Sequence, residues 1–285
     1  MKHVSTCLFV LAAAGTAFGQ SNFIDFESVP NNLPGVGGPD IRVPGDSNWY
    51  NPPNSATAGS VANGVGLGGS RGLIVGNNGS GNDGVIDNLR TPRLTGIAGE
   101  SVAPVNAANN TFQWSFWFRT VPTSAPAGNY RFRVESYGPD RTTFLGFQND
   151  GAGNLTASAF GIDAGANFVS TTIASSLQWG QWYRVTGSLT LNDGAANDTM
   201  TYGIYDTASL LVGSGVTASW EEGVRQLGYN GGQILGVDQL QFHSRGGFAG
   251  DHAYVDDVRY SVVPTPAAGA VLGLGGLAAL RRRRR

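Results

Sequence analysis

The segment from Phe112 to Arg119 alternates apolar and polar side chains without interruption. Successive side chains of an extended strand point to opposite faces, so the segment has one face of large apolar groups and one of mixed character. The first face carries Phe112, Trp114, Phe116 and Phe118, and the second carries Gln113, Ser115, Trp117 and Arg119. A face made of three phenylalanines and a tryptophan must be buried against a second layer. The segment therefore predicts a sheet that is packed on one side.

The rest of the chain favours an architecture built from strands. It contains 43 glycines, five glutamates and a single lysine at position 2, so strong helix formers are scarce. Alternating or apolar runs separated by turn residues predict strands at 22–27, 72–75, 84–89, 130–137, 143–148, 155–160, 182–191, 199–206, 235–243 and 253–262. We expect 199–206 to return on 182–191 as a hairpin, and the first and last strands to pair. The predicted fold class is all-β, a two-sheet antiparallel jelly-roll sandwich.

Three segments resemble those of the concanavalin A-like (laminin G-like) superfamily. They are Phe-x-x-Ser-Phe-Trp-Phe-Arg at 112–119, Trp-x-x-Trp-Tyr-x-Val at 179–185 and Tyr-Val-Asp-Asp-Val at 254–258. The resemblance covers most of the chain between its two ends and implies a sandwich of two sheets. Galactose-binding-like jelly rolls share the last motif and are the alternative fold.

The C-terminal end has the order of a sorting signal. Val263, Pro264, Thr265 and Pro266 precede an apolar run over 267–280, which is followed by Arg281, Arg282, Arg283, Arg284 and Arg285. Arginines stay on the cytoplasmic side of a membrane, because moving each through hydrocarbon costs at least about 2.5 kcal/mol. The tail resembles the PEP-CTERM signal of exopolysaccharide-producing Gram-negative bacteria, with Thr265 where Glu is usual. That resemblance implies cleavage by an exosortase-type protease; an ordinary C-terminal anchor helix is the alternative.

The N-terminal end predicts export. Lys2 and His3 precede an apolar run over 7–14 and a small-residue exit at 17–19. This pattern is typical of a secretory signal peptide over 1–19, which implies the Sec machinery as a partner. We therefore expect a transient inner-membrane anchor, and then a place at the cell surface or in the extracellular matrix.

This organisation leaves a β-sandwich domain over 20–262 and a sorting tail over 263–285. Between the signal peptide and Pro264 the chain carries 12 arginines against 20 carboxylates, a formal net charge of −8 with histidine neutral. An acidic surface repels phosphate backbones, which argues against nucleic acid as a partner. Cations and extracellular polysaccharide remain compatible with this charge.

The sequence lacks the common catalytic patterns. A zinc site needs clustered His and Cys, whereas the chain after the signal peptide has only His243 and His252 and no cysteine. Related sandwich hydrolases carry their carboxylates as Glu-x-Asp-x-x-Glu on one strand, and no such triplet occurs. We therefore predict that the protein is not an enzyme.

Carboxylates near the two ends of the domain suggest a cation site. Alternation places Asp256 on one face with Tyr254, Val258 and Tyr260, and we expect this face to be buried. In sandwich modules with this closing motif, a structural Ca²⁺ often joins the last strand to the first. That resemblance implies Asp256 or Asp257 with Asp25 or Glu27, all of which offer hard oxygen ligands. The alternative is that Asp256 accepts hydrogen bonds from backbone N–H groups or an arginine.

A ligand-binding face is a second hypothesis. If their strands are neighbours, Trp117 and Arg119 lie beside Trp182 and Arg184 and set aromatic planes among hydrogen-bonding groups, as sugar-binding surfaces do. The alternative is an ordinary solvated sheet face with a few packed aromatic rings.

Together these features predict an exported, surface-sorted β-sandwich with a structural or adhesive role and no catalytic activity. A lectin-like glycan-binding module is the second possibility. A polysaccharide hydrolase or lyase, with carboxylates that the sequence does not place, is the third.

Overall fold

The computed structural model describes residues 21–29, 49, 59–76, 86–94, 109–121, 131–137, 141–150, 153–162, 168–192, 198–217, 237–245 and 252–264. The predicted signal peptide and the sorting tail from Thr265 onward, including Pro266 and Arg281 to Arg285, lie outside the described residues.

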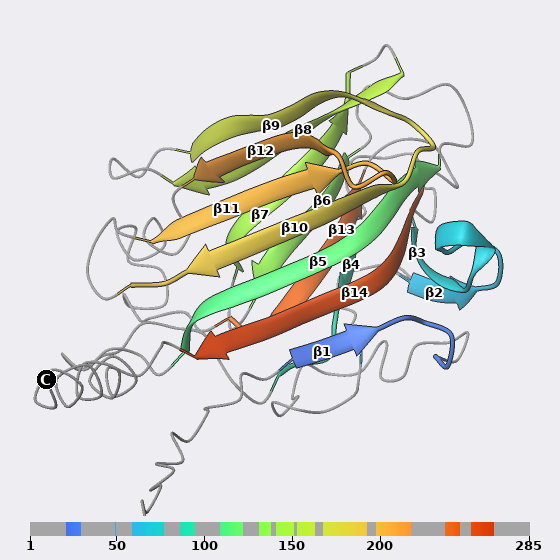
Figure 1. Ribbon diagram of the computed structural model, residues 1–285, viewed down its shortest axis with the longest axis horizontal. Coiled ribbons are helices and arrows are strands. Elements are labelled where there is room, and N and C mark those ends of the chain that lie inside the picture. The colour runs from blue at the N-terminus through green and yellow to red at the C-terminus, as the bar shows by residue number, and fades with distance from the viewer. Residues whose placement is uncertain are drawn as a thin grey trace, which may run out of the picture.

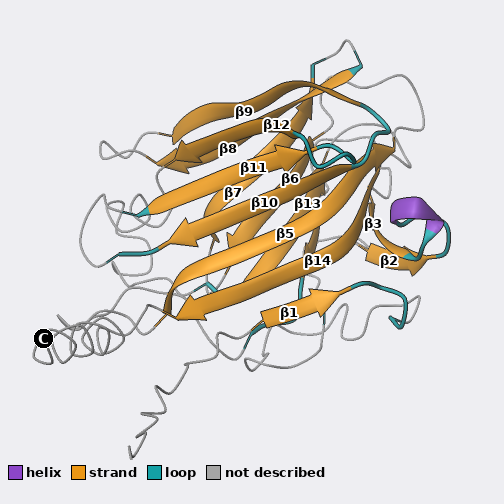
Figure 2. Cartoon of the chain, viewed as in Figure 1, coloured by secondary structure: helices purple, strands orange, loops and turns teal. Residues whose placement is uncertain are grey.

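Almost all of the described chain is in strands, with one short 3-10 turn, η1 (Leu67–Gly69), beside β2 and β3 (Figure 2). In chain order the strands are β1 (Ser21–Ile24), β2 (Gly59–Ala62), β3 (Gly72–Gly76), β4 (Ile86–Arg90), β5 (Asn109–Val121), β6 (Arg131–Tyr137), β7 (Arg141–Asn149), β8 (Asn154–Ile162), β9 (Phe168–Gln178), β10 (Tyr183–Thr190), β11 (Thr199–Tyr205), β12 (Leu211–Thr217), β13 (Gln239–Arg245) and β14 (His252–Pro264).

The strands form two stacked antiparallel sheets. The eight-stranded sheet has the order β12-β11-β10-β5-β14-β3-β2, with β1 also paired to β14, and the six-stranded sheet has the order β4-β13-β6-β7-β8-β9. Figure 1 shows the eight-stranded sheet in front and the other behind it. The predicted all-β, two-sheet antiparallel sandwich is therefore confirmed.

Both predicted pairings are also confirmed. β10 and β11 form the hairpin, with Leu189 opposite Met200. β1 pairs with β14, with Ser21 opposite Ser261, so the first and last described strands close the same sheet.

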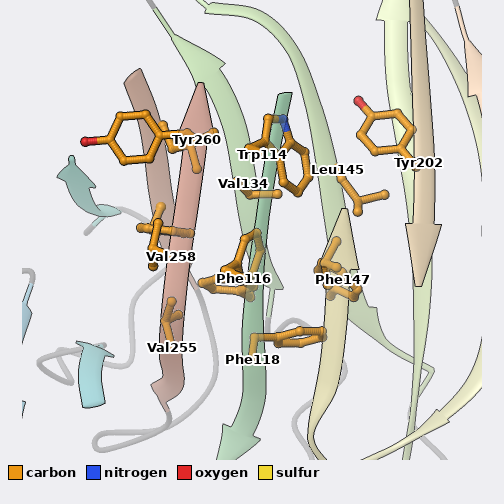
Figure 3. Packing of buried hydrophobic residues seen from close by; sticks show 14 of the residues in the cluster. Trp114, Phe116, Phe118, Val134, Leu145, Phe147, Tyr202, Val255, Val258 and Tyr260 are labelled. Atoms are coloured by element: carbon orange, nitrogen blue, oxygen red, sulfur yellow. The ribbon is translucent and has the colours of Figure 1, made fainter. Parts of the chain in front are cut away.

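The core lies between the two sheets and is dominated by aromatic rings from β5. Trp114, Phe116 and Phe118 point inward, as their alternation predicts, and all are at most 4% exposed. Phe118 packs on Phe147 of β7 (Figure 3), with ring centroids 4.3 Å apart. Phe116 meets Phe242 of β13 edge-on, with ring centroids 5.2 Å apart. Burying each such ring contributes roughly 1.5–3 kcal/mol, which explains why this one strand organises both sheets.

Three strands, β2, β9 and β12, lie outside the ranges predicted from the sequence. β9 is rich in Ser and Thr without clean alternation, and β12 contains Gly213 and Gly215. A Cβ at Gly213 would come within 2.5 Å of Ala174, and one at Gly215 within 2.4 Å of Ile173. These glycines let edge strand β12 approach β9 of the other sheet. They are needed for a tertiary contact, which the local sequence pattern does not predict.

The predicted placement of Asp256 on one face with Val258 and Tyr260 is wrong, because β14 contains a β-bulge. The register against β5 shifts just after Asp256, where Asp257 has a φ of 49°. The extra residue re-aims the strand, so Asp256 faces outward opposite Trp117 while Val258 and Tyr260 point into the core. Asp256 shares its face with Tyr254, as predicted, but not with Val258 and Tyr260, because strict alternation assumes an unbroken ladder.

The last strand extends further than expected. Val263 pairs with Thr111 and Pro264 with Asn109 after a second irregularity, so the ladder of β14 reaches the first proline of the predicted processing motif. Within the described residues no helix has the length and apolar character needed to cross a membrane.

Candidate functional site

The outer face of the six-stranded sheet carries a row of polar side chains that the sequence analysis missed. Arg90 of β4 donates from Nε to Oε1 of Gln241 at 2.7 Å, and Gln241 donates from Nε2 to Oε2 of Glu135 at 2.6 Å. His243 Nδ1 lies 4.0 Å from Oε1 of the same carboxylate. The residues meet because β4, β13 and β6 are adjacent, with Gln241 opposite both Arg90 and Glu135.

Three of these side chains are buried even though they lie on an outer sheet face. Glu135 is fully buried, and Gln241 and His243 are 3% and 6% exposed. Burying a carboxylate costs free energy unless the group is paired and hydrogen-bonded. The hydrogen bonds of this network offset the cost and hold its side chains in fixed positions. Sequence reasoning could not find it because its members come one or two at a time from three strands.

A groove of about 460 Å³ adjoins this row on the same face, and we call it the β6–β8 groove. Its side chains come from three neighbouring strands, including Arg131, Arg133, Gln148, Thr156, Ser158 and Phe160. They form two cross-strand rows, in which Arg131, Gln148 and Thr156 are opposite one another, as are Arg133, Gly146 and Ser158.

Gly146 makes the hollow. A Cβ at this position would lie 3.3 Å from the Phe160 ring and 3.7 Å from Cγ of Arg133, so any larger side chain would fill the space between them. Besides Gly146, the described lining residues are two arginines, two amide residues, two hydroxyl residues and two phenylalanines, and none of these described residues carries a carboxylate. This arrangement is suited to a hydroxyl-rich ligand that carries negative charge.

The structure brings together the four residues of the predicted ligand face. β5 and β10 are neighbours on the eight-stranded sheet, and Trp117 is directly opposite Arg184. The guanidinium of Arg119 lies 5.2 Å from the Trp182 ring and 4.9 Å from that of Tyr254. One side of each of these two rings is thus already covered by a cation, which reduces their value as sugar platforms.

The predicted calcium carboxylates hold a loop. Asp256 Oδ2 accepts from the Leu67 N–H at 2.8 Å and from Ser70 Oγ at 3.1 Å, and Oδ1 accepts from the Asp257 N–H at 2.8 Å. Glu27 accepts from the Arg71 N–H at 2.9 Å. Burial raises the pKa of the Asp256 carboxyl, although these hydrogen bonds oppose the shift. The hydrogen-bonding alternative for Asp256 is therefore what the geometry shows.

Asp25 accepts from the Glu27 N–H at 3.2 Å and stays on the same turn. Across the described part of the chain, no three His, Cys, Asp or Glu side chains are grouped so that they could hold a metal ion. Calcium binding stays a prediction that these contacts do not test.

No protein-family model matches the chain, and no curated protein matches it significantly. Solved structures with a similar fold include the CBM2 module of an evolved Dit protein from Lactobacillus casei BL23 phage J-1 (10% identity, 87% of this chain and 98% of that chain, TM-score 0.47). They also include peanut lectin (12%, 87% and 99%, 0.41) and an alginate lyase from Pseudomonas aeruginosa (14%, 67% and 82%, 0.41). Identities this low, with TM-scores below 0.5, say nothing of what this chain binds.

Proposed function

We propose that this chain is a glycan-binding β-sandwich whose β6–β8 groove takes an acidic polysaccharide. The observation that carries the proposal is the groove itself, with Arg131 and Arg133 beside Gln148 and two hydroxyls. Guanidinium groups match carboxylates in a planar, bidentate geometry, and amides and hydroxyls match sugar hydroxyls. The domain carries a formal net charge of −8, so a lining whose described residues include two arginines and no carboxylate is a local exception to its overall charge.

The place of action is proposed from the two ends of the sequence. A signal peptide over 1–19 and a tail over 263–285 support Sec export, exosortase-type processing and delivery to the cell surface or matrix. Acidic exopolysaccharide would be met there, and a binding domain without catalysis would act as an adhesive or structural component. A structural Ca²⁺ at the carboxylates of β14 and of the turn after β1 is compatible with this role.

One observation favours a second candidate, a polysaccharide-cleaving enzyme. Glu135 and His243 lie 4.0 Å apart and buried, and His243 is directly opposite Arg133 of the groove. A carboxylate and an imidazole that lie beside a substrate can act as general acid and general base. Binding without turnover remains the proposed activity.

The test is titration of the purified protein with oligosaccharides of polygalacturonate and of hyaluronan, beside a neutral dextran. Gly146→Val fills the hollow, and we expect it to weaken binding of the acidic sugar at least about tenfold, or about 1.4 kcal/mol. Gly76→Val is the matched control, because Gly76 is also a strand glycine and nothing lies within 4 Å of its Cβ position. Equal affinity of Gly146→Val and wild type would contradict the groove as the site.

A second measurement separates binding from cleavage. Incubation with the polymers should release no reducing ends if the protein only binds. Release that is lost in Glu135→Gln, with binding retained, would establish the enzymatic candidate instead.

A further inference from the structure

The opposite face of the sandwich is also hollowed. One depression of about 390 Å³ lies over β1, β14 and β5, and another of about 370 Å³ lies over β5, β10, β11 and β12. Gln113 of β5 lines both, so the two depressions meet at this exposed side chain. We call these two adjoining depressions together the β5 trough. It crosses six strands, which at about 4.8 Å between neighbours spans roughly 24 Å.

The lining of the β5 trough is polar along its length and apolar at its ends. Its small polar side chains include Asn22, Ser115, Thr186, Ser188, Thr201 and Ser261. Exposed large apolar groups stand at the two ends, with Phe23 50% exposed on β1 and Leu211 56% exposed on β12. A lipid surface or a protein partner would need a continuous apolar centre, whereas hydroxyls and amides are the natural complement of sugar hydroxyls.

Two arginines at the trough are held in place by aromatic rings. The guanidinium of Arg259 lies 4.2 Å from the Phe23 ring, and that of Arg184 lies 4.8 Å from the ring of Tyr205, which lines the trough. Within the described residues neither arginine forms an ion pair with a carboxylate. The Arg259 side chain is exposed, and Arg184 is half-buried, with its Nε buried and without a hydrogen-bond partner among the described residues. Each guanidinium is thus held against a ring and still has N–H groups that can donate to an anionic ligand.

We propose that the β5 trough is a second binding site for an extended, carboxylate-bearing polysaccharide chain. The sandwich then has a site on each outer face, and one molecule joins two polymer chains. This inference takes the class of polymer from the proposed function, but the trough is built from strands that contribute nothing to the β6–β8 groove. A protein with two opposed sites acts as a cross-link, which single-site binding cannot do.

The experiment expresses the whole chain in cells that process it naturally, and places one negative charge in each site in turn. Gln113→Glu does so in the trough and Gln148→Glu in the groove; both side chains are exposed, and both changes are nearly isosteric. Each variant is the other's control for net charge. Binding stoichiometry is measured with short oligogalacturonates, and cross-linking as the rise in viscosity of a polygalacturonate solution.

We expect wild type to bind two oligosaccharides and to raise the viscosity. Each variant should bind one and raise it no more than a non-binding protein does. A single site in wild type, lost in Gln148→Glu and unchanged in Gln113→Glu, overturns the second site and leaves the proposed function standing. A single site lost only in Gln113→Glu overturns the groove instead, and no binding by wild type overturns both.

A second pair of variants guards against a folding defect. Thr201→Glu adds a charge on the exposed side of β11 within the trough, and Thr201→Gln is its neutral control. Loss of cross-linking in the first but not the second supports the trough, and equal behaviour of the two contradicts it.

Discussion

At the scale of single residues, carboxylates from both ends of the domain hold one loop. Asp256 accepts hydrogen bonds from Leu67 and Ser70, and Glu27 accepts one from Arg71, so the segment around η1 is fixed to β14 and to the turn after β1. Gly66 permits this approach, because a Cβ there would come within 2.7 Å of Asp256 Oδ2. These acidic side chains hold the loop around η1 by hydrogen bonds, whether or not a cation also binds to them.

The pKa of Asp256 gives a test of this arrangement. Burial raises that pKa above its ordinary value of 3.8. The folded state therefore binds more protons in mild acid than the unfolded chain, so this group's contribution to stability is largest below pH 3.8 and is lost as the pH rises through the folded pKa. We expect the free energy of unfolding of wild type, relative to Asp256→Asn, to increase on acidification. Denaturant titrations from neutral to acid pH measure it, and a decrease would show that hydrogen bonding outweighs burial.

At the scale of elements, the bulge in β14 decides which side chains reach the core. Asp257 adopts a left-handed backbone conformation, and the strand alternates with the opposite phase on either side of it. Removing one residue from a strand moves every following side chain to the other face. Val258, Tyr260 and Val262, all at most 2% exposed, depend on this one extra residue.

Deleting Asp257 should therefore prevent folding, whereas Asp257→Gly should change the free energy of unfolding by no more than about 1 kcal/mol, because glycine adopts this backbone conformation without strain. Thermal unfolding of the two variants compares them directly. A cooperative transition at the wild-type temperature in the deletion variant would refute this account of the strand.

At the scale of the whole molecule, export and sorting predict a mature protein that lacks both ends. We expect mass spectrometry of secreted material to find a new N-terminus near residue 20 and a C-terminus near the Pro264–Pro266 motif. In cells without the sorting protease, the tail with its five arginines should remain. Mature protein that retains Arg281 to Arg285 in both strains would contradict the sorting prediction.

The sequence by itself determined the fold class and the inward face of most strands. Alternation is a local property, so Phe112 to Phe118 specify a buried face wherever their strand is placed. It also placed Trp117 and Arg184 on outward faces, where they meet.

Apart from the β10–β11 and β1–β14 pairs, only the tertiary structure decided which strands are neighbours, and therefore which outward residues share a site. Glu135, Gln241 and Arg90 are far apart in the chain and join because β6, β13 and β4 are adjacent. The need for glycine at position 187 also depends on strand order. Gly187 lies opposite Trp114 of the neighbouring strand, and a Cβ there would lie 2.3 Å from the indole ring. Strand order and bulges are set by packing between distant segments, so the periodicity of a single strand does not predict them.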